Sequence, residues 1–190
     1  MKKSLFLILM FSLLLISCKN RSVISEENTA TAQADSRGYI VEVGDDAPEF
    51  EIEYLDGRIE MLSDHKGKVV MIQFTASWCG VCRKEMPFIE DKIWKKHSDN
   101  PDFLLIGIDF KEDAETTSKF AKDLNITYPL TLDLSGEKFE LFCGPDAGVT
   151  RNIIVDPQGK IIMLTRLFEE EEFNSMVELI DSELEKISKK

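Results

Sequence analysis

Apolar residues along the chain gather into short continuous runs and into amphipathic stretches separated by turn signals. The runs from Val69 to Phe74 and from Phe103 to Ile108 have the length and composition of strands buried on both faces. Between and after them, apolar residues recur at helical spacing. The pattern predicts strands at 49–54, 58–62, 69–74, 103–108, 153–155 and 161–164, and helices at 79–97, 113–124 and 169–187.

Turn residues support these boundaries. Asp56-Gly57 indicates a hairpin between the first two strands, and Asp156-Pro157-Gln158-Gly159 indicates a turn between the last two. Pro87 lies inside the first predicted helix, where it is expected to cause a kink. Strands that alternate with helices predict an α/β domain. Its central mixed sheet should be flanked by helices on both faces and preceded by the N-terminal hairpin.

The first eighteen residues follow a different pattern. Lys2 and Lys3 form a basic head, and the apolar run from Leu5 to Ile16 is interrupted only by Ser12. This run is shorter than the roughly 20 residues that a membrane-spanning helix needs. It also lacks a polar face, which disfavours a buried amphipathic helix. The arrangement is typical of a secretory signal peptide.

The end of this run reads Leu15-Ile16-Ser17-Cys18 and resembles the lipobox of bacterial lipoprotein signals. The resemblance implies cleavage before Cys18 and acylation of that cysteine, so that several acyl chains tether the mature protein to a membrane. The next residues are polar or small with almost no large apolar side chain, which predicts a flexible tether. We therefore expect a signal peptide at 1–17, a lipidated tether at 18–37 and a folded domain at 38–190.

The charge of the chain excludes one class of function. The 190 residues include 35 acidic and 23 basic side chains, which gives a formal net charge of -12. Binding to nucleic acid needs a surplus of Lys and Arg, so no nucleic-acid partner is expected. The acidity is typical of a solvated surface. The length fits one ordinary domain beyond the tether, and we expect a monomer.

Cys79 and Cys82 follow the apolar run at 69–74, at the place where the next helix should begin. A thiolate at a helix N-terminus faces unpaired backbone N–H groups and the positive end of the helix dipole, which lowers its pKa. The first cysteine, the more exposed of the pair, is then the nucleophile. The second lies one turn into the helix and can attack the mixed disulfide that forms. The pair therefore favours thiol–disulfide exchange.

Two further roles for this cysteine pair are open from the residues alone. Two cysteines at this spacing can be half of a zinc site, but His65 and His97 are isolated and no second ligand pair is present. We therefore expect no metal and no cofactor. The cysteines can also be simple buried thiols, which their position at a strand-to-helix junction disfavours.

The stretch around the cysteines reads Gln73-Phe74-Thr75-Ala76-Ser77-Trp78-Cys79-Gly80-Val81-Cys82-Arg83-Lys84-Glu85-Met86-Pro87. It resembles the active-site block of TlpA/ResA-type thiol–disulfide oxidoreductases, a group of the thioredoxin superfamily related to AhpC/TSA proteins. The stretches 43–50 and 156–160 also match the pattern of that family, and the resemblance extends from about residue 40 to residue 188. It implies a thioredoxin-like fold and an extracytoplasmic enzyme.

Glu85 matches a glutamate that ResA-like proteins place near the cysteine pair. It lies three positions after Cys82, so helical spacing returns it to the same side of the helix. A carboxylate there can exchange the proton of the Cys82 thiol and would raise the pKa of a nearby thiol. The alternative is a solvated helix glutamate. Gln73 stands where cytoplasmic thioredoxins carry a buried acid, which favours Glu85 as the substitute.

Three positions depart from the family pattern. Val81 replaces a common proline, and Thr75 replaces an aromatic residue. Thr150 occupies the place of a cis-proline beside the active site, and a cis bond before another residue type costs roughly 3–4 kcal/mol. We expect the Val149–Thr150 bond to be trans, or cis and strained. The substrate loop formed by Trp78, Val149 and Thr150 should be reshaped, with the threonine hydroxyl close to the first cysteine.

These features predict an enzyme that reduces disulfides of exported proteins at the cell envelope, lipid-anchored and facing the periplasm. Cys79 attacks the client disulfide, Cys82 resolves the mixed disulfide, and Glu85 manages the protons. A membrane electron donor must then reduce the pair again. The resemblance implies that apocytochrome c is among the clients. The same chemistry in reverse gives a disulfide oxidase, and the sequence does not set the direction.

Two further classes of function are alternatives. Arg151 and Thr75 are faintly similar to peroxiredoxin residues, which suggests a thioredoxin-fold peroxidase, although no Pro-x-x-x-Thr-x-x-Cys pattern is present. A non-enzymatic metal-binding or interaction module is the second class, although copper delivery in similar folds uses a longer Cys-x-x-x-Cys spacing.

Cys143 is the cysteine that remains once Cys18 is acylated and Cys79 is matched with Cys82. It is either a small buried thiol or an auxiliary thiol that pairs with Cys79 or a client.

Overall fold

The computed structural model describes residues 38–189, so the expected signal peptide, Cys18 and the tether lie outside the described residues. The regular elements of the described domain are β1 (Glu51–Glu53), β2 (Ile59–Met61), β3 (Val69–Thr75), α1 (Gly80–Ile89), α2 (Lys95–His97), β4 (Phe103–Phe110), α3 (Ala114–Leu124), β5 (Leu130–Asp133), α4 (Glu137–Glu140), β6 (Arg151–Val155), β7 (Ile161–Arg166) and α5 (Glu170–Ser188). Within the part of the chain that the structure describes, no helix is both long enough and apolar enough to cross a membrane.

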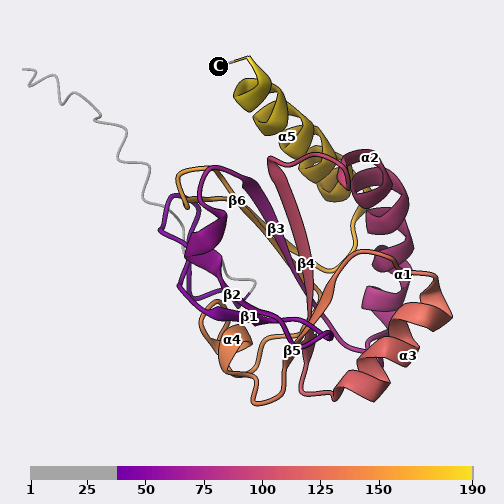
Figure 1. The fold of residues 1–190 in the computed structure, drawn as a ribbon. Helices are drawn as coiled ribbons and strands as arrows, with labels where there is room; N and C mark the ends of the chain where they lie inside the picture. Colours follow the sequence, from indigo (N-terminus) through magenta and orange to yellow (C-terminus); the bar gives the residue numbers. More distant parts are fainter. Residues whose placement is uncertain (1–37, 190) are drawn as a thin grey trace, which may run out of the picture. The chain divides into compact units, whose positions relative to one another are not determined.

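A five-stranded mixed sheet forms the centre of the domain, in the order β5-β4-β3-β6-β7 (Figure 1). β3, β4 and β5 are parallel, whereas β6 is antiparallel to both β3 and β7. β1 and β2 form a separate antiparallel pair joined by the predicted turn. Every side chain of β3 is buried, as its continuous apolar run predicts for a central strand.

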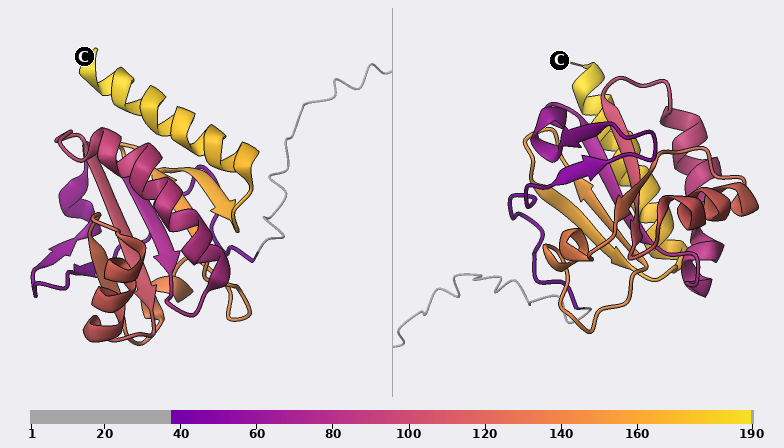
Figure 2. Two further views of the ribbon diagram at one scale, coloured as in Figure 1. Left: turned by 90° about the vertical axis from the view of Figure 1, so that its right-hand side faces the viewer. Right: turned by 60° about the horizontal axis from the view of Figure 1, so that its bottom comes forward.

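The two faces of the sheet are covered by different elements. On one face, Phe74 of β3 packs against Phe139 of α4, with ring centroids 5.2 Å apart. On the other face, Thr75 contacts Met86 of α1, because successive strand residues point to opposite faces. Figure 2 shows α1, α3 and α5 together in front of the strands in its left view. The predicted sheet with helices on both faces and an N-terminal hairpin is therefore confirmed.

The helix predicted at 79–97 consists of three segments. α1 contains Pro87, and the chain continues from Ile89 through a π-helical turn at Glu90–Trp94 into α2. Proline cannot donate a backbone hydrogen bond, and a widened turn accommodates such a loss within a continuing helix. The carboxylate of Glu90 accepts hydrogen bonds from the N–H and hydroxyl of Thr127 (2.8 and 2.7 Å), which ties this turn to the segment before β5.

Two elements were absent from the predicted order. β5 follows Pro129 directly and includes the buried polar residues Thr131 and Asp133, so it lacks the apolar run that marks β3 and β4. α4 spans only four residues, which is too short for a helical period to appear. The carboxylate of Asp133 accepts hydrogen bonds from three backbone N–H groups at the start of α4. The side chain of Asp133 therefore joins the end of β5 to the start of α4.

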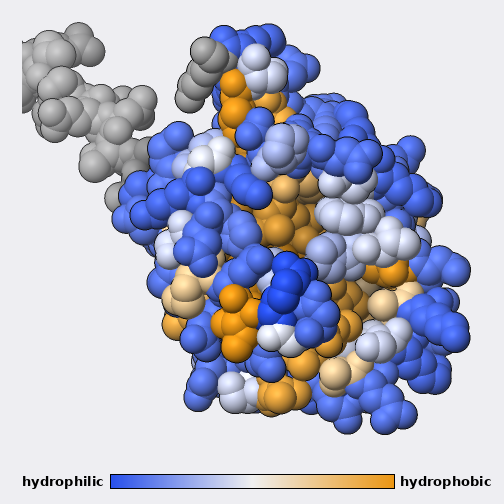
Figure 3. All heavy atoms as spheres, viewed as in Figure 1, coloured by the Kyte–Doolittle hydropathy of each residue, from blue (hydrophilic) through white to orange (hydrophobic). Residues whose placement is uncertain are grey.

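Figure 3 shows hydrophilic residues over most of one face, with apolar patches between them.

Candidate active site

A disulfide joins Cys79 and Cys82 at the point where β3 leads into α1. Cys79 is the N-cap residue of α1, and its sulfur accepts a hydrogen bond from the backbone N–H of Cys82 (3.1 Å). The Cys79 side chain is 8% exposed and that of Cys82 is 0% exposed. After reduction, the outer sulfur faces the helix N-terminus, which stabilises a thiolate. The inner sulfur is placed to attack a mixed disulfide on Cys79.

The hydroxyl of Thr150 contacts both sulfurs of the disulfide. Its Oγ1 is 3.1 Å from the Sγ of Cys79 and 3.2 Å from the Sγ of Cys82. The described residues contain no cis peptide bond, so the bond between Val149 and Thr150 is trans. The backbone of Thr150 is fixed as well, because its carbonyl accepts a hydrogen bond from the N–H of Leu167 (3.0 Å). A hydroxyl in this place can donate to a thiolate, which the proline of related proteins cannot do.

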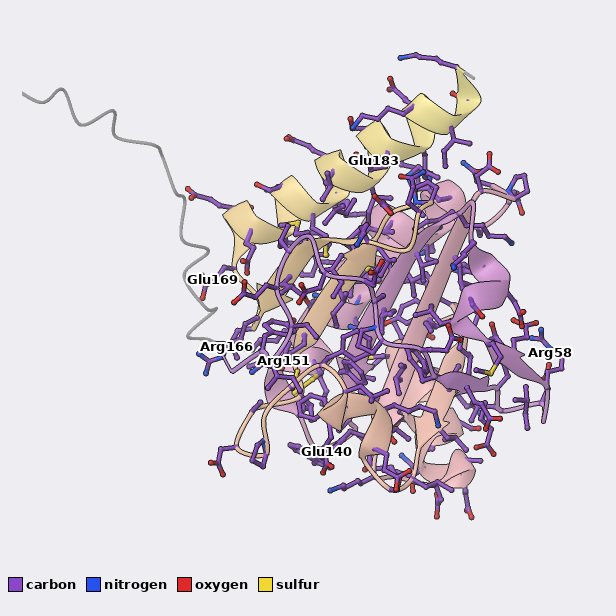
Figure 4. All side chains as sticks on the ribbon, turned by 90° about the vertical axis from the view of Figure 1, so that its left-hand side faces the viewer. Arg58, Glu140, Arg151, Arg166, Glu169 and Glu183 are labelled. Atoms are coloured by element: carbon purple, nitrogen blue, oxygen red, sulfur yellow. A yellow bond between two sulfur atoms is a disulfide. The ribbon has the colours of Figure 1, made fainter. Side chains whose placement is uncertain are left out.

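The three residues of the predicted substrate loop differ in exposure. Trp78 is 64% exposed and directly precedes Cys79, so its ring is available to a client. Val149 and Thr150 are both buried, so Val149 packs its side chain into the core. Figure 4 shows the disulfide in yellow at the end of the sheet where Arg151 of β6 and Arg166 of β7 are labelled.

Glu85 lies on α1 three residues after Cys82, with 2% of its surface exposed, so it is not a solvated helix glutamate. Asn152 donates a hydrogen bond to its Oε1 (2.7 Å), and Gln73 donates to its Oε2 (3.5 Å). Burial raises the pKa of the Glu85 carboxyl to about 7, and the two amide donors lower it only in part. Glu85 can therefore hold or release a proton near neutral pH.

The two amides belong to one row of residues across the sheet. Gln73 of β3 pairs with Asn152 of β6, which pairs with Thr165 of β7. The hydroxyl of Tyr128 donates to Oε1 of Gln73 (2.7 Å), so the Nε2 group of Gln73 is oriented towards Glu85. Asn152 Nδ2 also donates to the hydroxyl of Thr165 (2.9 Å). We refer to Gln73, Asn152, Tyr128 and Thr165 as the amide cradle.

A glycine makes room for this arrangement. Gly107 of β4 pairs with Gln73 on the other side of the row. A Cβ atom at position 107 would lie 2.5 Å from the side chain of Leu130 and 3.1 Å from the ring of Tyr128. Glycine is therefore needed here for the close approach of Tyr128. Gln73 was singled out from the sequence, whereas the remaining members of the cradle were missed, although a polar Asn152 within an otherwise apolar strand was a signal.

Comparison with known proteins identifies the family. The model of the AhpC/TSA family matches residues 43–163. The chain belongs to the AhpC/TSA family. Thiol-disulfide oxidoreductase ResA from Bacillus thuringiensis subsp. konkukian is 30% identical over 125 residues, which cover 64% of this chain and 68% of that protein. This member of the AhpC/TSA family is a thiol–disulfide oxidoreductase, as predicted.

Solved structures confirm the thioredoxin-like fold of this AhpC/TSA protein. A solution structure from Bacteroides thetaiotaomicron, provisionally assigned as a protein disulfide isomerase, is 56% identical with a TM-score of 0.76. It covers 78% of this chain and 93% of its own. A crystal structure from Chlorobium tepidum, provisionally assigned as the thiol:disulfide interchange protein DsbE, has a TM-score of 0.66 and 24% identity, covering 76% and 99% of the two chains. The second likeness concerns the fold alone.

The AhpC/TSA family name raises the peroxidase alternative again. The hydroxyl of Thr75 donates a hydrogen bond to the Sδ of Met86 (3.2 Å), so it helps to hold α1 against β3. Arg151 is fully buried, donates from Nε to the carbonyl of Gly148 (2.8 Å) and lies over the ring of Tyr39. These contacts give both residues structural roles and provide no support for a peroxide site.

Cys143 lies in the core. Its side chain is 1% exposed, and its backbone forms an isolated antiparallel bridge with Tyr39. A thiol buried to this degree is not accessible to a client. Burial therefore favours the interpretation of Cys143 as a small buried thiol over that of an auxiliary redox thiol.

Replacing Thr150 with valine should slow the alkylation of reduced Cys79 at neutral pH. Valine has the same shape but cannot donate to the thiolate, and the loss of one such hydrogen bond corresponds to a rate change of about fivefold. The rate is measured with iodoacetamide, and the modified residue is identified by mass spectrometry. Thr131→Val is the matched control, because this buried threonine of β5 bonds to the carbonyl of Gly107. An unchanged rate in Thr150→Val would show that the hydroxyl does not reach the thiolate.

Proposed function

We propose that this oxidoreductase works outside the cytoplasm, anchored by lipid at Cys18, and reduces disulfides in exported proteins. One observation carries the chemistry. The Cys79–Cys82 disulfide lies at the N-terminus of α1, and the amide cradle holds the carboxyl of Glu85 one helical turn after Cys82. A redox pair and a buried group that titrates near neutral pH are the two components that disulfide reduction with proton transfer needs.

The reaction begins with the reduced pair. The Cys79 thiolate attacks one sulfur of the client disulfide, a Cys79–client disulfide forms, and the other client sulfur leaves as a thiolate that takes up a proton. Cys82 then loses its proton and attacks the sulfur of Cys79. This second step forms the Cys79–Cys82 disulfide and releases the second client sulfur as a thiolate, which takes up a proton from the solvent. Glu85 accepts the proton of Cys82 when ionised and returns one when the pair is reduced again.

The return to the reduced state requires two electrons from another protein, while Glu85 returns the proton to Cys82. We assign this role to a membrane electron donor, because a lipid anchor on Cys18 would keep the domain near the membrane. The leader pattern supports the envelope location, since a basic head, a short apolar run and a lipobox-like end precede the tether. Apocytochrome c is the client that the family resemblance favours.

The position of Glu85 supports the reducing direction of electron flow. A buried carboxylate disfavours a second negative charge nearby, so it opposes formation of a Cys82 thiolate. Less stable thiolates make the reduced pair a stronger reductant. The reverse function, a disulfide oxidase, would require a reduction potential near that of DsbA, at roughly -120 mV rather than the roughly -270 mV of thioredoxin.

Trapping with Cys82→Ala tests the proposal in cells that express the full chain. Cys79 can still attack, but the mixed disulfide cannot be resolved, so clients should accumulate on Cys79 in the membrane fraction. The matched control carries Cys79→Ser as well and should trap nothing. Cys18→Ala should release the trapped complexes from the membrane. Recovery of cytoplasmic proteins alone, or of no protein, would contradict the proposed client class.

A further inference from the structure

The turn that leads into Cys79 is held from two sides. The N–H of Cys79 donates to the carbonyl of Ala76 (3.1 Å), which makes Ser77 a central residue of the turn. The backbone N–H and the hydroxyl of Ser77 both donate to the carboxylate of Glu112, each at 2.6 Å. From the other side, Arg83 donates to the carbonyl of Ser77 (3.0 Å). The loop after β4 and the first turn of α1 therefore fix the position of this turn.

A second carboxyl lies next to Glu112. The side chain of Asp109, near the end of β4, is 0% exposed, and its carboxyl interacts with the side chains of Glu112 and Thr117. Burial and the neighbouring carboxyl of Glu112 raise the pKa of Asp109 to about 8, while Thr117 acts in the opposite direction. A buried carboxyl without a cation keeps its proton and can donate it in a hydrogen bond to a carboxylate.

The other charged groups near this pair are few. Arg83 of α1 donates a hydrogen bond to the carbonyl of Ser77, and its guanidinium lies over the ring of Phe120. Lys111, on the loop after β4, places its ammonium over the ring of Phe110. Asp113 and Glu115 at the start of α3 are exposed to solvent. β3 contributes Thr75, the register neighbour of Asp109, which carries no charge. Glu112 is therefore the charged group that acts on Asp109.

We propose that Asp109 and Glu112 form a carboxyl pair that positions Cys79 for attack on a client disulfide. Glu112 fixes the turn through both donors of Ser77, and protonated Asp109 holds Glu112 in that place. When Asp109 loses its proton, its buried negative charge faces the charge of the half-buried Glu112. Glu112 then moves away from Ser77 and the turn loosens. Both acids are positioning residues, because neither touches the sulfur atoms.

The test is the pH dependence of insulin disulfide reduction by the reduced protein. The wild-type rate should rise with thiolate formation and then fall by roughly tenfold above pH 8 as the nucleophile loses its alignment. Asp109→Asn should remove that fall, because an amide does not ionise. Glu112→Ala should be roughly tenfold slower than the wild type below pH 8 and should show no further fall above it, and Glu112→Gln should recover part of the rate because its amide oxygen still accepts a hydrogen bond. Glu115→Gln, an exposed acid nearby, is the matched control and should keep the wild-type profile.

A second measurement covers the case in which Asp109→Asn does not fold. In the wild-type protein, NMR should show the side-chain carboxyl of Asp109 and the backbone amide of Ser77 titrating with the same midpoint. A Ser77 amide signal that does not follow Asp109, or the same fall in rate for Asp109→Asn as for the wild type, would overturn the carboxyl pair. This inference rests on Cys79 as the attacking thiol. Insulin reduction by Cys79→Ser would refute that assignment, and the two failures can be told apart.

Discussion

Cys79→Ser should lower the rate of disulfide reduction on the order of a thousandfold or more, because the attacking thiolate is lost. Cys82→Ser should behave differently and keep one attack per molecule. The two sulfurs differ in position, since Cys79 caps the N-terminus of α1 whereas Cys82 is completely buried one turn further in. Mass spectrometry of each variant mixed with a model disulfide should show one mixed disulfide per Cys82→Ser chain and none on Cys79→Ser.

Cys143→Ser is the matched control for these variants, because it removes a buried thiol from the core and leaves the pair intact. Its reductase rate should equal that of the wild type. A mixed disulfide on Cys79→Ser would mean that Cys82 is reached by clients directly, which would reverse the order of attack.

Glu85→Gln should change the pH dependence of both stability and activity. Burial raises the pKa of the folded-state carboxyl from 4.5 to about 7, so the folded protein binds this proton more tightly than the unfolded chain does. The free energy of unfolding therefore falls as the pH rises from about 4.5 to about 7, by about 3 kcal/mol, and no further loss from this group occurs above that range. The neutral glutamine should remove this loss. Reductase activity should fall on the order of a hundredfold, because no carboxylate takes the proton of Cys82.

Denaturant unfolding at a series of pH values measures the stability effect. Asp109 has a raised pKa as well, so it contributes a further loss that continues to about pH 8. Asp109→Asn is therefore the matched comparison, and the double variant should lose both contributions. A Glu85→Gln protein with the same stability profile as the wild type would show that Glu85 is not the group that titrates near neutral pH.

Much of the fold could be predicted because its signals are local. Continuous apolar runs marked β3 and β4, and Asp113 caps the helix predicted after them, since its side chain accepts the N–H of Thr116. β5 was missed because its burial depends on neighbours far away in the sequence, and Thr131 and Asp133 interrupt its apolar pattern. The π-helical turn after α1 was also missed, because only a kink at Pro87 could be inferred.

In the active site, too, contacts within one helix could be predicted and contacts between distant segments could not. Spacing alone brought Cys79, Cys82 and Glu85 together, since they follow one another on a single helix. Thr150 was singled out because it departs from the family pattern, but its distances to both sulfurs required the fold. Asn152 could not be assigned a role, because its contact with Glu85 joins residues 67 positions apart. Long-range hydrogen bonds of this kind leave no pattern in one sequence.

Gly107 has a consequence that extends beyond its own strand. A side chain there would displace Leu130 and Tyr128, and Tyr128 is the residue that orients Gln73 towards Glu85. The pKa of the Glu85 carboxyl thus depends on Gly107, a position whose nearest neighbours are Leu130, Tyr128 and Gln73 rather than either sulfur. A substitution where β4 and β5 pair would therefore change proton transfer by Glu85, although every residue of the Cys-Gly-Val-Cys segment stayed the same.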